Sequence, residues 1–172
     1  MFHLRILSAA FCLGLAALLP APTAAAPLPE PTGRVILELA GAIAANNGNS
    51  AARFDLAMLD ALPQRETVTR TPWYDGAQIF SGPLMADLIN AVGGAGSALR
   101  VVAINDYAVE IPIADIATYP IILASRLGGQ PMSVREKGPL FVIYPFDESP
   151  ALNNEIYYSR SVWQVKRIEV LP

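Results

Sequence analysis

The chain has 172 residues, enough for one domain with a hydrophobic core. Its formal net charge is −3, and this mild acidity argues against a nucleic-acid partner, which requires a basic face. The chain has a single cysteine, so a disulfide framework is excluded.

Residues 1–25 have the pattern of a secretory signal peptide. A short basic start precedes an uninterrupted apolar run, and small residues suit cleavage after Ala25. The apolar run is shorter than the roughly 20 residues that span a bilayer. We therefore expect a protein that is secreted across the inner membrane into the periplasm, without a membrane span after cleavage.

Cleavage would also remove His3 and Cys12, the only histidine and the only cysteine. A mature chain without these side chains has no Ser-His-Asp or Cys-His nucleophile system and no ordinary zinc site. We accordingly predict no metal ligands and no catalytic residues of these types. The proline-rich residues 26–33 predict a flexible lead, and residues 34–172 predict one domain.

The domain begins with a predicted strand in "RVILELAGAIA", residues 34–44. "RFDLAMLDALP", residues 53–63, predicts a short helix that ends at its proline. A second strand follows, because apolar and polar side chains alternate around Val68. This strand is predicted to end in a turn at Asp75–Gly76.

The clearest helix signal lies in "SGPLMADLINAVGG", residues 81–94. Ser81 is predicted to cap its amino end, Pro83 suits the first turn, and Gly93 can close the carboxyl end. Apolar side chains recur at i, i+4, i+5 and i+8 and share one face. They are Leu84, Leu88, Ile89 and Val92.

Short strands dominate the second half. Two hairpins are predicted, with turns at Asn105–Asp106 and Gly128–Gly129. "GPLFVIYP" predicts a strand bounded by glycine and proline, and "SVWQVKRIEV" predicts a closing strand with alternating Val162, Gln164, Lys166 and Ile168. With few helices between the strands, the fold class is predicted as α+β, with mainly antiparallel or mixed pairing.

Five segments occur in a recognisable order: "FSGPLMADLINAVG", "INDYAVEIPIADI", "IILASRLGGQPM", "KGPLFVIYP" and "SVWQVKRIEV". In this order they resemble the molybdopterin-binding domain of the sulfite oxidase-like family, and the resemblance runs from about Arg34 to Val170. It implies a compact α+β fold that holds a pyranopterin cofactor between loops at one end of its sheets. It also implies that Asp106 and Tyr107 help to shape that pocket.

The chain departs from the family at the metal ligand. The resemblance implies that active members bind molybdenum through a cysteine before a tryptophan-containing turn. The corresponding stretch here is "VTRTPW", residues 68–73, with threonines and no cysteine. Soft thiolates suit this kind of metal site, and a threonine hydroxyl is a poor substitute. We therefore expect molybdopterin to be absent or metal-free.

Three cations, Arg126, Arg135 and Lys137, lie within a short stretch and could hold a phosphate or carboxylate. The alternative is a solvated hairpin rim, since charged turns are common. Near the lost metal ligand, Trp73 could stack on a planar ligand while Arg70 pairs with its charge. The alternative there is that Trp73 anchors the core.

Tyr157, Tyr158 and Arg160 precede the closing strand. We expect one tyrosine to point inward and the other outward, because strand side chains alternate. A place at the pocket edge is predicted for Tyr158 and Arg160, with ordinary packing and a surface cation as the alternative.

Two functions remain open from the sequence. The first is an exported binding domain for a small anionic or planar ligand, which could also serve as a periplasmic sensory subunit beside a membrane sensor or redox partner. The second is a molybdopterin-dependent oxidoreductase with altered metal ligation. An assembly partner of either kind is compatible with the same residues.

Overall fold

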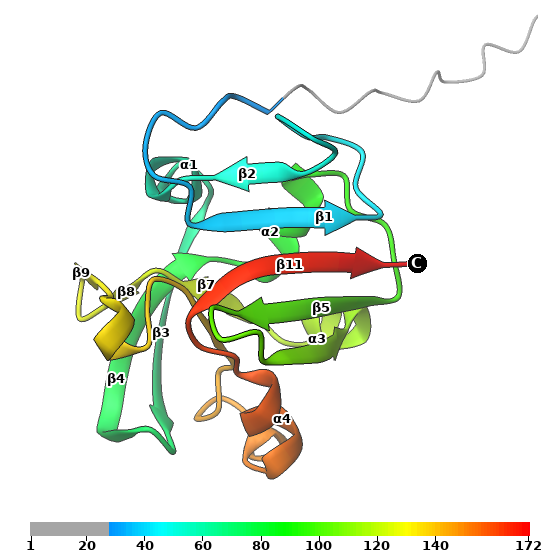
Figure 1. Cartoon of the computed structure of the whole chain (residues 1–172). Helices are drawn as coiled ribbons and strands as arrows, with labels where there is room; N and C mark the ends of the chain where they lie inside the picture. Colours follow the sequence, from blue (N-terminus) through cyan, green and yellow to red (C-terminus); the bar gives the residue numbers. More distant parts are fainter. Residues whose placement is uncertain (1–27) are drawn as a thin grey trace, which may run out of the picture.

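The computed structural model describes residues 28–172 (Figure 1). The strands are β1 (Leu37–Gly41), β2 (Ala52–Phe54), β3 (Gln64–Thr71), β4 (Tyr74–Pro83), β5 (Ala98–Ala103), β6 (Ala108–Pro112), β7 (Ile122–Ala124), β8 (Arg126–Leu127), β9 (Gln130–Pro131), β10 (Phe141–Ile143) and β11 (Val165–Leu171). The α-helices are α1 (Leu56–Asp60), α2 (Met85–Ala91), α3 (Ile113–Thr118) and α4 (Glu155–Arg160), and the 3₁₀ helices are η1 (Val134–Glu136) and η2 (Pro150–Leu152).

The larger sheet has the strand order β2-β1-β11-β5-β6 and lies toward the viewer in Figure 1. The closing strand β11 pairs with β1 in parallel and with β5 in an antiparallel ladder, so the two ends of the domain meet in one sheet. Apolar side chains on its inner face pack against α2 and α3. Burial of this face supplies the main core of the domain.

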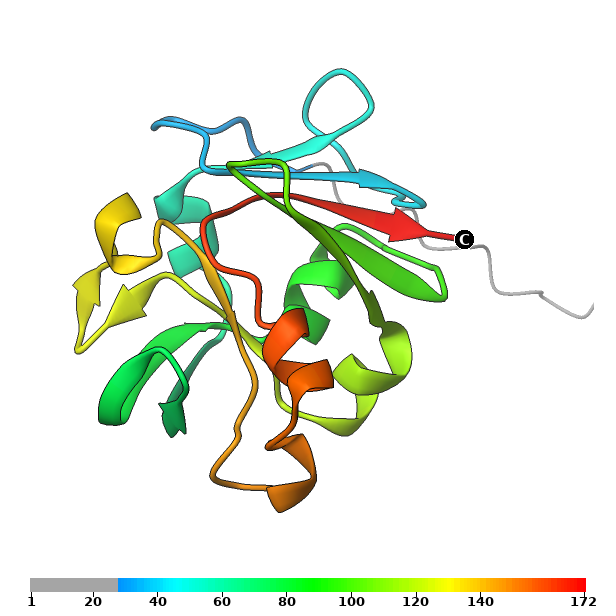
Figure 2. The ribbon, with the colours of Figure 1, turned by 60° about the horizontal axis from the view of Figure 1, so that its bottom comes forward.

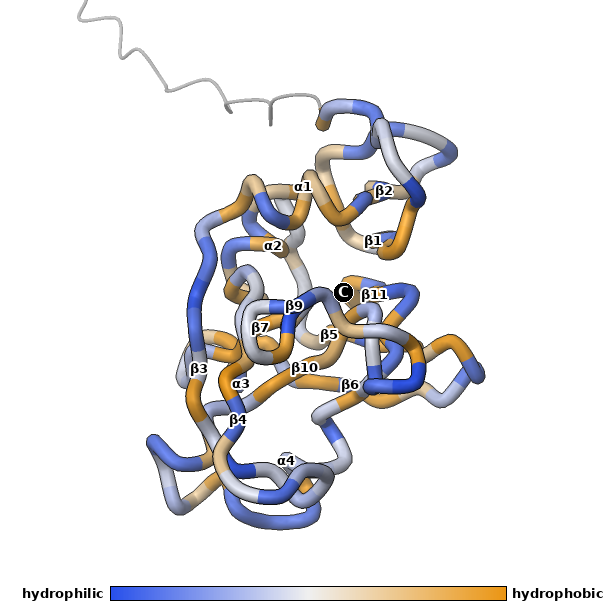
Figure 3. Tube along the Cα trace, turned by 90° about the vertical axis from the view of Figure 1, so that its left-hand side faces the viewer, coloured by the Kyte–Doolittle hydropathy of each residue, from blue (hydrophilic) through white to orange (hydrophobic). Residues whose placement is uncertain are grey.

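A second sheet, β3-β4-β8-β9, and the pair β7-β10 complete the fold. Every residue of β7 and β10 is buried, which is why "GPLFVIYP" is almost continuously apolar. Figure 3 shows the hydrophobic colours along these inner strands. A bridge between Phe141 and Trp163 joins β10 to the segment that leads into β11.

The predicted α+β class, with mostly antiparallel short strands and few helices, is confirmed. Both predicted hairpin turns are present, at Asn105–Asp106 between β5 and β6 and at Gly128–Gly129 between β8 and β9. Gly128 and Gly129 both have a positive φ, as a type I′ turn requires, whereas in the Asn105–Asp106 turn only Asp106 does. Leu88, Ile89 and Val92 of the predicted apolar helix face are buried.

Two local predictions about β4 and α2 were wrong. The chain reverses at Pro72–Trp73, and Asp75–Gly76 form a bulge inside β4, where the register against β3 shifts. Ser81 lies in β4 and does not cap α2, which begins at Met85 without a side-chain cap. Pairing of β4 with β3 and β8 competes successfully with the local capping signal.

Two predictions near the carboxyl end were also wrong. Residues 155–160 form helix α4, so Tyr157 and Tyr158 do not alternate across a strand. The strand β11 begins only at Val165 and has an irregularity between Val165 and Arg167. This irregularity shifts the alternation, so that Ile168 faces inward together with Val165 while Lys166 is exposed.

The described part of the proline-rich lead is hydrogen-bonded to the domain. The backbone N–H groups of Thr32 and Gly33 donate to the Asp55 carboxylate, and the Asn47 side chain donates to the Pro29 carbonyl. These contacts join residues 29–33 to the domain that was predicted to begin at Arg34. The predicted signal peptide lies outside the described residues. Within residues 28–172, no helix has the length and apolar character needed to cross a bilayer.

Candidate functional site

A cavity of about 360 Å³ opens between α4, the β5-β6 turn and the β3-β4 turn. In Figure 1, α4 lies at the lower end of the molecule, and Figure 2 brings this end forward. We call this hollow the aromatic cavity. Its lining residues are Trp73, Ala103, Asn105, Tyr107, Glu155, Tyr158, Ser159, Ser161, Val162 and Trp163. Its volume is at the lower end of the range for small-molecule sites.

Two indole rings and two phenol rings form the wall. The ring centroid of Trp73 lies 5.6 Å from that of Trp163 and 6.2 Å from that of Tyr158, both in edge-to-face arrangements. Trp163 is 39% exposed and Tyr107 is 51% exposed. Large aromatic rings that remain this accessible beside a cavity can receive a further ring or a cation.

The core fixes the orientation of the two indoles. Phe141 of the buried strand β10 lies 5.4 Å from Trp73 and 6.2 Å from Trp163, measured between ring centroids. Trp73 follows Pro72 in the β3-β4 turn, and the bridge to Phe141 holds Trp163. Both readings of Trp73 from the sequence therefore apply, because it packs on the core and also lines the cavity.

Helix α4 contributes further lining residues, and contacts with Asp115 and Tyr144 hold its last turn in place. The Arg160 guanidinium donates to the Asp115 carboxylate at 2.8 Å, and the Tyr144 hydroxyl donates to the same oxygen at 2.9 Å. Burial raises the pKa of the Tyr144 hydroxyl, and the neighbouring Asp115 carboxylate raises it further. These contacts tie the last turn of α4 to α3 and to the segment after β10.

The polar groups of the cavity include both acceptors and neutral donors. The hydroxyl groups of Ser159 and Ser161 donate to backbone carbonyls of α4, and the exposed Ser159 keeps its lone pairs for a ligand, whereas Ser161 is buried. The Tyr158 hydroxyl donates to Asn153 at 3.4 Å. Among the described lining residues, Glu155 is the only one with a formal charge. Neutral donors are supplied by the Asn105 amide and the two indole N–H groups.

Three of the predicted site residues, Trp73, Tyr107 and Tyr158, meet at the aromatic cavity. The other six do not line it: Arg70, Asp106, Arg126, Arg135, Lys137 and Arg160. The predicted cations are therefore not gathered around a common anion site. Lys137 is the cation that comes near, since its ammonium lies 5.5 Å from the Trp163 ring centroid and 5.4 Å from that of Tyr74.

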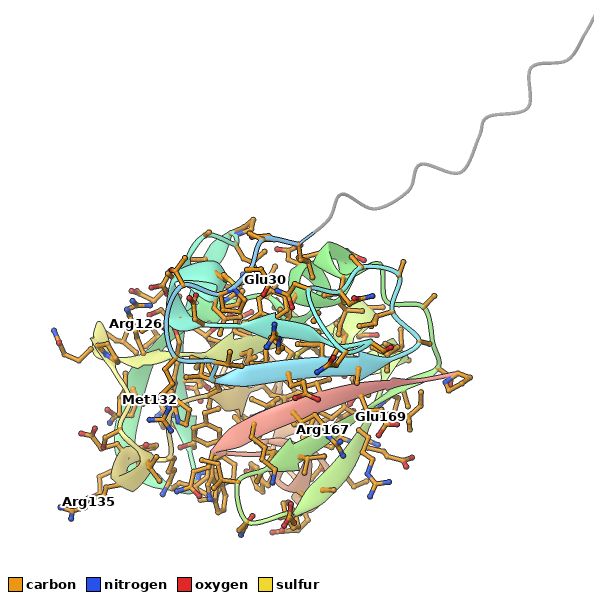
Figure 4. The ribbon with its side chains drawn as sticks, turned by 45° about the horizontal axis from the view of Figure 1, so that its top comes forward. Glu30, Arg126, Met132, Arg135, Arg167 and Glu169 are labelled. Atoms are coloured by element: carbon orange, nitrogen blue, oxygen red, sulfur yellow. The ribbon has the colours of Figure 1, made fainter. Side chains whose placement is uncertain are left out.

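Two of the three cations that lie close together in the sequence, Arg126 and Arg135, lie apart in the structure. Arg126 forms a two-point ion pair with Asp60, with one N–O distance of 2.7 Å, and this pairing raises the pKa of Arg126. Arg135 is exposed on η1 and extends away from the body of the domain in Figure 4. The solvated-rim alternative describes Arg135, and Arg126 serves to tie β8 to α1.

The remaining predicted residues take part in surface ion pairs. Asp106 accepts from Lys166 at 2.7 Å, and this hydrogen bond lowers the pKa of the Asp106 carboxyl. Both residues border a second hollow of about 420 Å³ on the outer face of the large sheet. Arg70 lies within 4.0 Å of Asp147, and its backbone N–H donates to the same carboxylate.

Sequence reasoning did not select Trp163, Asn105 or Glu155 as ligand-binding residues. Trp163 was not selected because the closing strand was expected to include it, whereas Trp163 lies in the segment that precedes β11. A helix-start signal could have revealed Glu155, because the Asn154 side chain caps α4 and accepts from the Ile156 N–H. That signal would also have placed Tyr158 and Ser159 together near one wall.

The described residues do not fit a molybdenum centre of the kind that the resemblance implies. Residues 28–172 contain no cysteine or histidine, and within them no three acidic side chains gather as a metal site would require. In and next to residues 68–73, where the resemblance implies the metal ligand, the Thr71 and Thr67 hydroxyls are buried without a hydrogen-bond partner in the described part of the chain. A hydroxyl is a hard oxygen donor and does not replace a soft thiolate.

No protein-family model matches the chain. No curated protein matches it either. Among solved structures, the crystal structure of the sulfane dehydrogenase SoxCD from Paracoccus pantotrophus matches with a TM-score of 0.57 and 14% sequence identity. The match covers 78% of this chain and 37% of that chain, so this chain corresponds to a minor part of the larger protein. At this identity the match shows a shared fold, in agreement with the α+β fold that the sequence resemblance implied.

Proposed function

We propose that this protein is a small-ligand-binding domain whose site is the aromatic cavity. The observation that carries the proposal is the meeting of Trp73, Tyr107, Tyr158 and Trp163 around one accessible hollow. These residues come from three separate parts of the chain, and two of them remain more than a third exposed. Stacking of a planar group on such rings is favourable and needs no charge.

A planar ligand suits the cavity better than an anionic one. The lining offers ring faces, hydroxyl lone pairs and one carboxylate, whereas the predicted anion grip would need cations that point into it. Arg126 and Arg160 are occupied by Asp60 and Asp115. Of the two ligand types expected from the sequence, the planar one is therefore the one we propose.

The wider role that we propose is that of an exported subunit, because the amino-terminal sequence has the pattern of a signal peptide. A periplasmic binding domain without its own chemistry would act by presenting its ligand-bound state to another protein, such as a membrane sensor. Export is tested by the mass of the mature chain, since cleavage after Ala25 removes residues 1–25.

A molybdopterin-dependent oxidoreductase with altered metal ligation is the second candidate. It is favoured by the fold shared with a sulfane dehydrogenase. Elemental analysis of protein made in a host that synthesises the cofactor separates the two candidates. Stoichiometric molybdenum would support the oxidoreductase and would overturn the binding-domain proposal.

The binding proposal is tested by tryptophan fluorescence. The chain has two tryptophans and both line the aromatic cavity, so their emission serves as a probe of the site. We expect small planar compounds to quench this emission saturably, and Trp163→Leu to weaken their binding at least about tenfold. Val68→Ser, at an exposed position on β3, is the matched control and should bind as the unaltered protein does. Equal binding by Trp163→Leu would refute the site.

A further inference from the structure

From the charge and hydrogen-bonding pattern of the aromatic cavity, we infer that its ligand is a small organic cation, either a planar aromatic cation or a quaternary ammonium ion. This inference rests on the proposed function and adds the sign of the ligand charge. It also reverses one expectation from the sequence, in which three nearby cations suggested a site for anions.

The first step is the electrostatic character of the ring faces. An aromatic ring is negative over its face and positive at its edge, so a cation over the face is attracted. Two indole rings and two phenol rings line the cavity, and indole is the best of the aromatic partners for a cation. Lys137 shows this preference within the chain, because its ammonium already lies 5.5 Å from the Trp163 ring centroid.

The second step is the carboxylate of Glu155. Among the described lining residues it carries the only formal charge, and it takes part in none of the ion pairs formed within residues 28–172. A carboxylate beside aromatic faces attracts a cation and repels an anion. Its position in the first turn of α4 also suits the helix dipole, so the stability of a Glu155 variant must be measured beside its ligand binding to separate these two roles.

The third step is the direction of the hydroxyl groups. Ser159 donates to the Ile156 carbonyl at 2.8 Å, and Ser161 donates to the Tyr157 carbonyl at 3.0 Å. Because these protons are committed to α4, the oxygens can serve a ligand only as acceptors. Ser161 is buried, so this applies to the exposed Ser159. The rings, the Glu155 carboxylate and the Ser159 hydroxyl oxygen thus all favour positive charge in the same small space.

Basic side chains near the cavity do not reverse this pattern. Arg160 is held by Asp115 at 2.8 Å beneath α4 and does not line the cavity. Lys137 contacts Trp163 and Tyr74 but is also outside the lining. Because Lys137 already lies over the Trp163 ring, a ligand cation is expected beside Trp73, Tyr107 and Tyr158, where it displaces no existing ion pair.

Three probes of similar shape and different charge test the inference. They are 1-methylquinolinium, which is a planar cation, 4-methylquinoline, which is neutral at mildly alkaline pH, and 1-naphthoate, which is a planar anion. Binding to the purified full protein is measured by tryptophan emission and checked by calorimetry. We expect the cation to bind about tenfold more tightly than the neutral ring, and the anion to bind most weakly.

Two charge-neutral variants locate the effect. Glu155→Gln should weaken binding of 1-methylquinolinium about threefold to fivefold and leave 4-methylquinoline unchanged. Glu66→Gln removes the same charge from an exposed position on β3 and should change neither. The thermal midpoint of each variant is measured alongside, so that any unfolding is detected separately from binding.

The outcomes separate the charge inference from the proposed function. If all three probes bind equally well, the planar site stands and the inference of a cation is overturned. If 1-naphthoate binds most tightly, the inference is likewise overturned and an anion site is indicated. If none of the three binds, both the proposed function and the inference fail.

Discussion

The anchor beneath α4 gives a prediction that can be worked out quantitatively. Asp115 is 8% exposed and accepts from Arg160 and from Tyr144, and the Tyr144 side chain is fully buried. Asp115→Ala would leave a largely buried guanidinium without its carboxylate and a buried hydroxyl without its acceptor. Removing one partner of a buried ion pair costs about 3 to 5 kcal/mol, and an unsatisfied buried hydroxyl accounts for part of that.

We expect the lower end of this range, about 3 kcal/mol, because the Arg160 side chain keeps 22% of its exposure and can recover some hydration. In a domain of this size, such a loss lowers the thermal midpoint by roughly 10 °C. The assay is denaturant-induced unfolding of Asp115→Ala, with Tyr144→Phe as a milder companion that should cost about 1.5 kcal/mol.

The matched control is Glu148→Ala, which removes an equally short ion pair at the surface. Arg65 and Glu148 lie 2.8 Å apart, but their side chains are 35% and 49% exposed. Exposed pairs contribute about 1 kcal/mol or less, so the two variants should differ clearly. A cost below about 1 kcal/mol for Asp115→Ala would refute the reasoning that this network holds α4 in place.

Three further predictions follow from particular contacts. Gly82→Ala should destabilise the domain by about 3 kcal/mol, because the new Cβ would lie 2.1 Å from the Leu123 carbonyl oxygen. Gly128→Ala has open space around it and should cost only about 1 kcal/mol. Denaturant-induced unfolding measures the cost of each variant. Burial raises the pKa of Tyr144, so the contribution of its hydroxyl to the free energy of unfolding is complete below the ordinary tyrosine pKa and is lost as the pH rises above that value. Unfolding measured over a series of alkaline pH values should therefore show a smaller loss of stability in Tyr144→Phe than in the unaltered chain. The Asp55 carboxylate accepts hydrogen bonds from the backbone N–H groups of Met58 and Gly33, and these bonds lower its pKa. The stability that they provide is lost as the pH falls through the folded-state pKa. Asp55→Asn should therefore lose less stability than the unaltered chain when unfolding is measured at decreasing pH.

Much of the fold could be predicted from the sequence because its signals are local. The Asn105–Asp106 and Gly128–Gly129 turns depend on residues that tolerate a positive φ, and they are where they were expected. The buried strand β10 was visible as an apolar run between glycine and proline. Signals of this kind need no knowledge of distant partners.

The wrong predictions arose where pairing decides the outcome. Ser81 has the chemistry of a helix cap, yet its backbone pairs with Glu66 of β3 and Arg126 of β8. The turn at Pro72–Trp73 is set by the register of β3 against β4 and leaves Gly76 in a bulge. Neither ladder can be seen from the local residues alone.

Only part of the candidate site could be predicted from the sequence, for a related reason. Trp73, Tyr107 and Tyr158 stood out as aromatic residues in segments that resembled a known family. The cations Arg126 and Arg135 are close in sequence, but one is paired with Asp60 and the other points into solvent. Charges that are neighbours along the chain become a binding site only when the fold turns them toward one hollow.

The central claim, that the aromatic cavity is where a ligand binds, is tested most directly by nuclear magnetic resonance. The indole N–H groups of Trp73 and Trp163 give the chain's two tryptophan side-chain signals, and both belong to the cavity. During titration with 1-methylquinolinium, both signals should shift and saturate together. If neither signal moves while residues around Lys166 on the outer sheet face respond, the ligand binds in the other hollow and the account is contradicted.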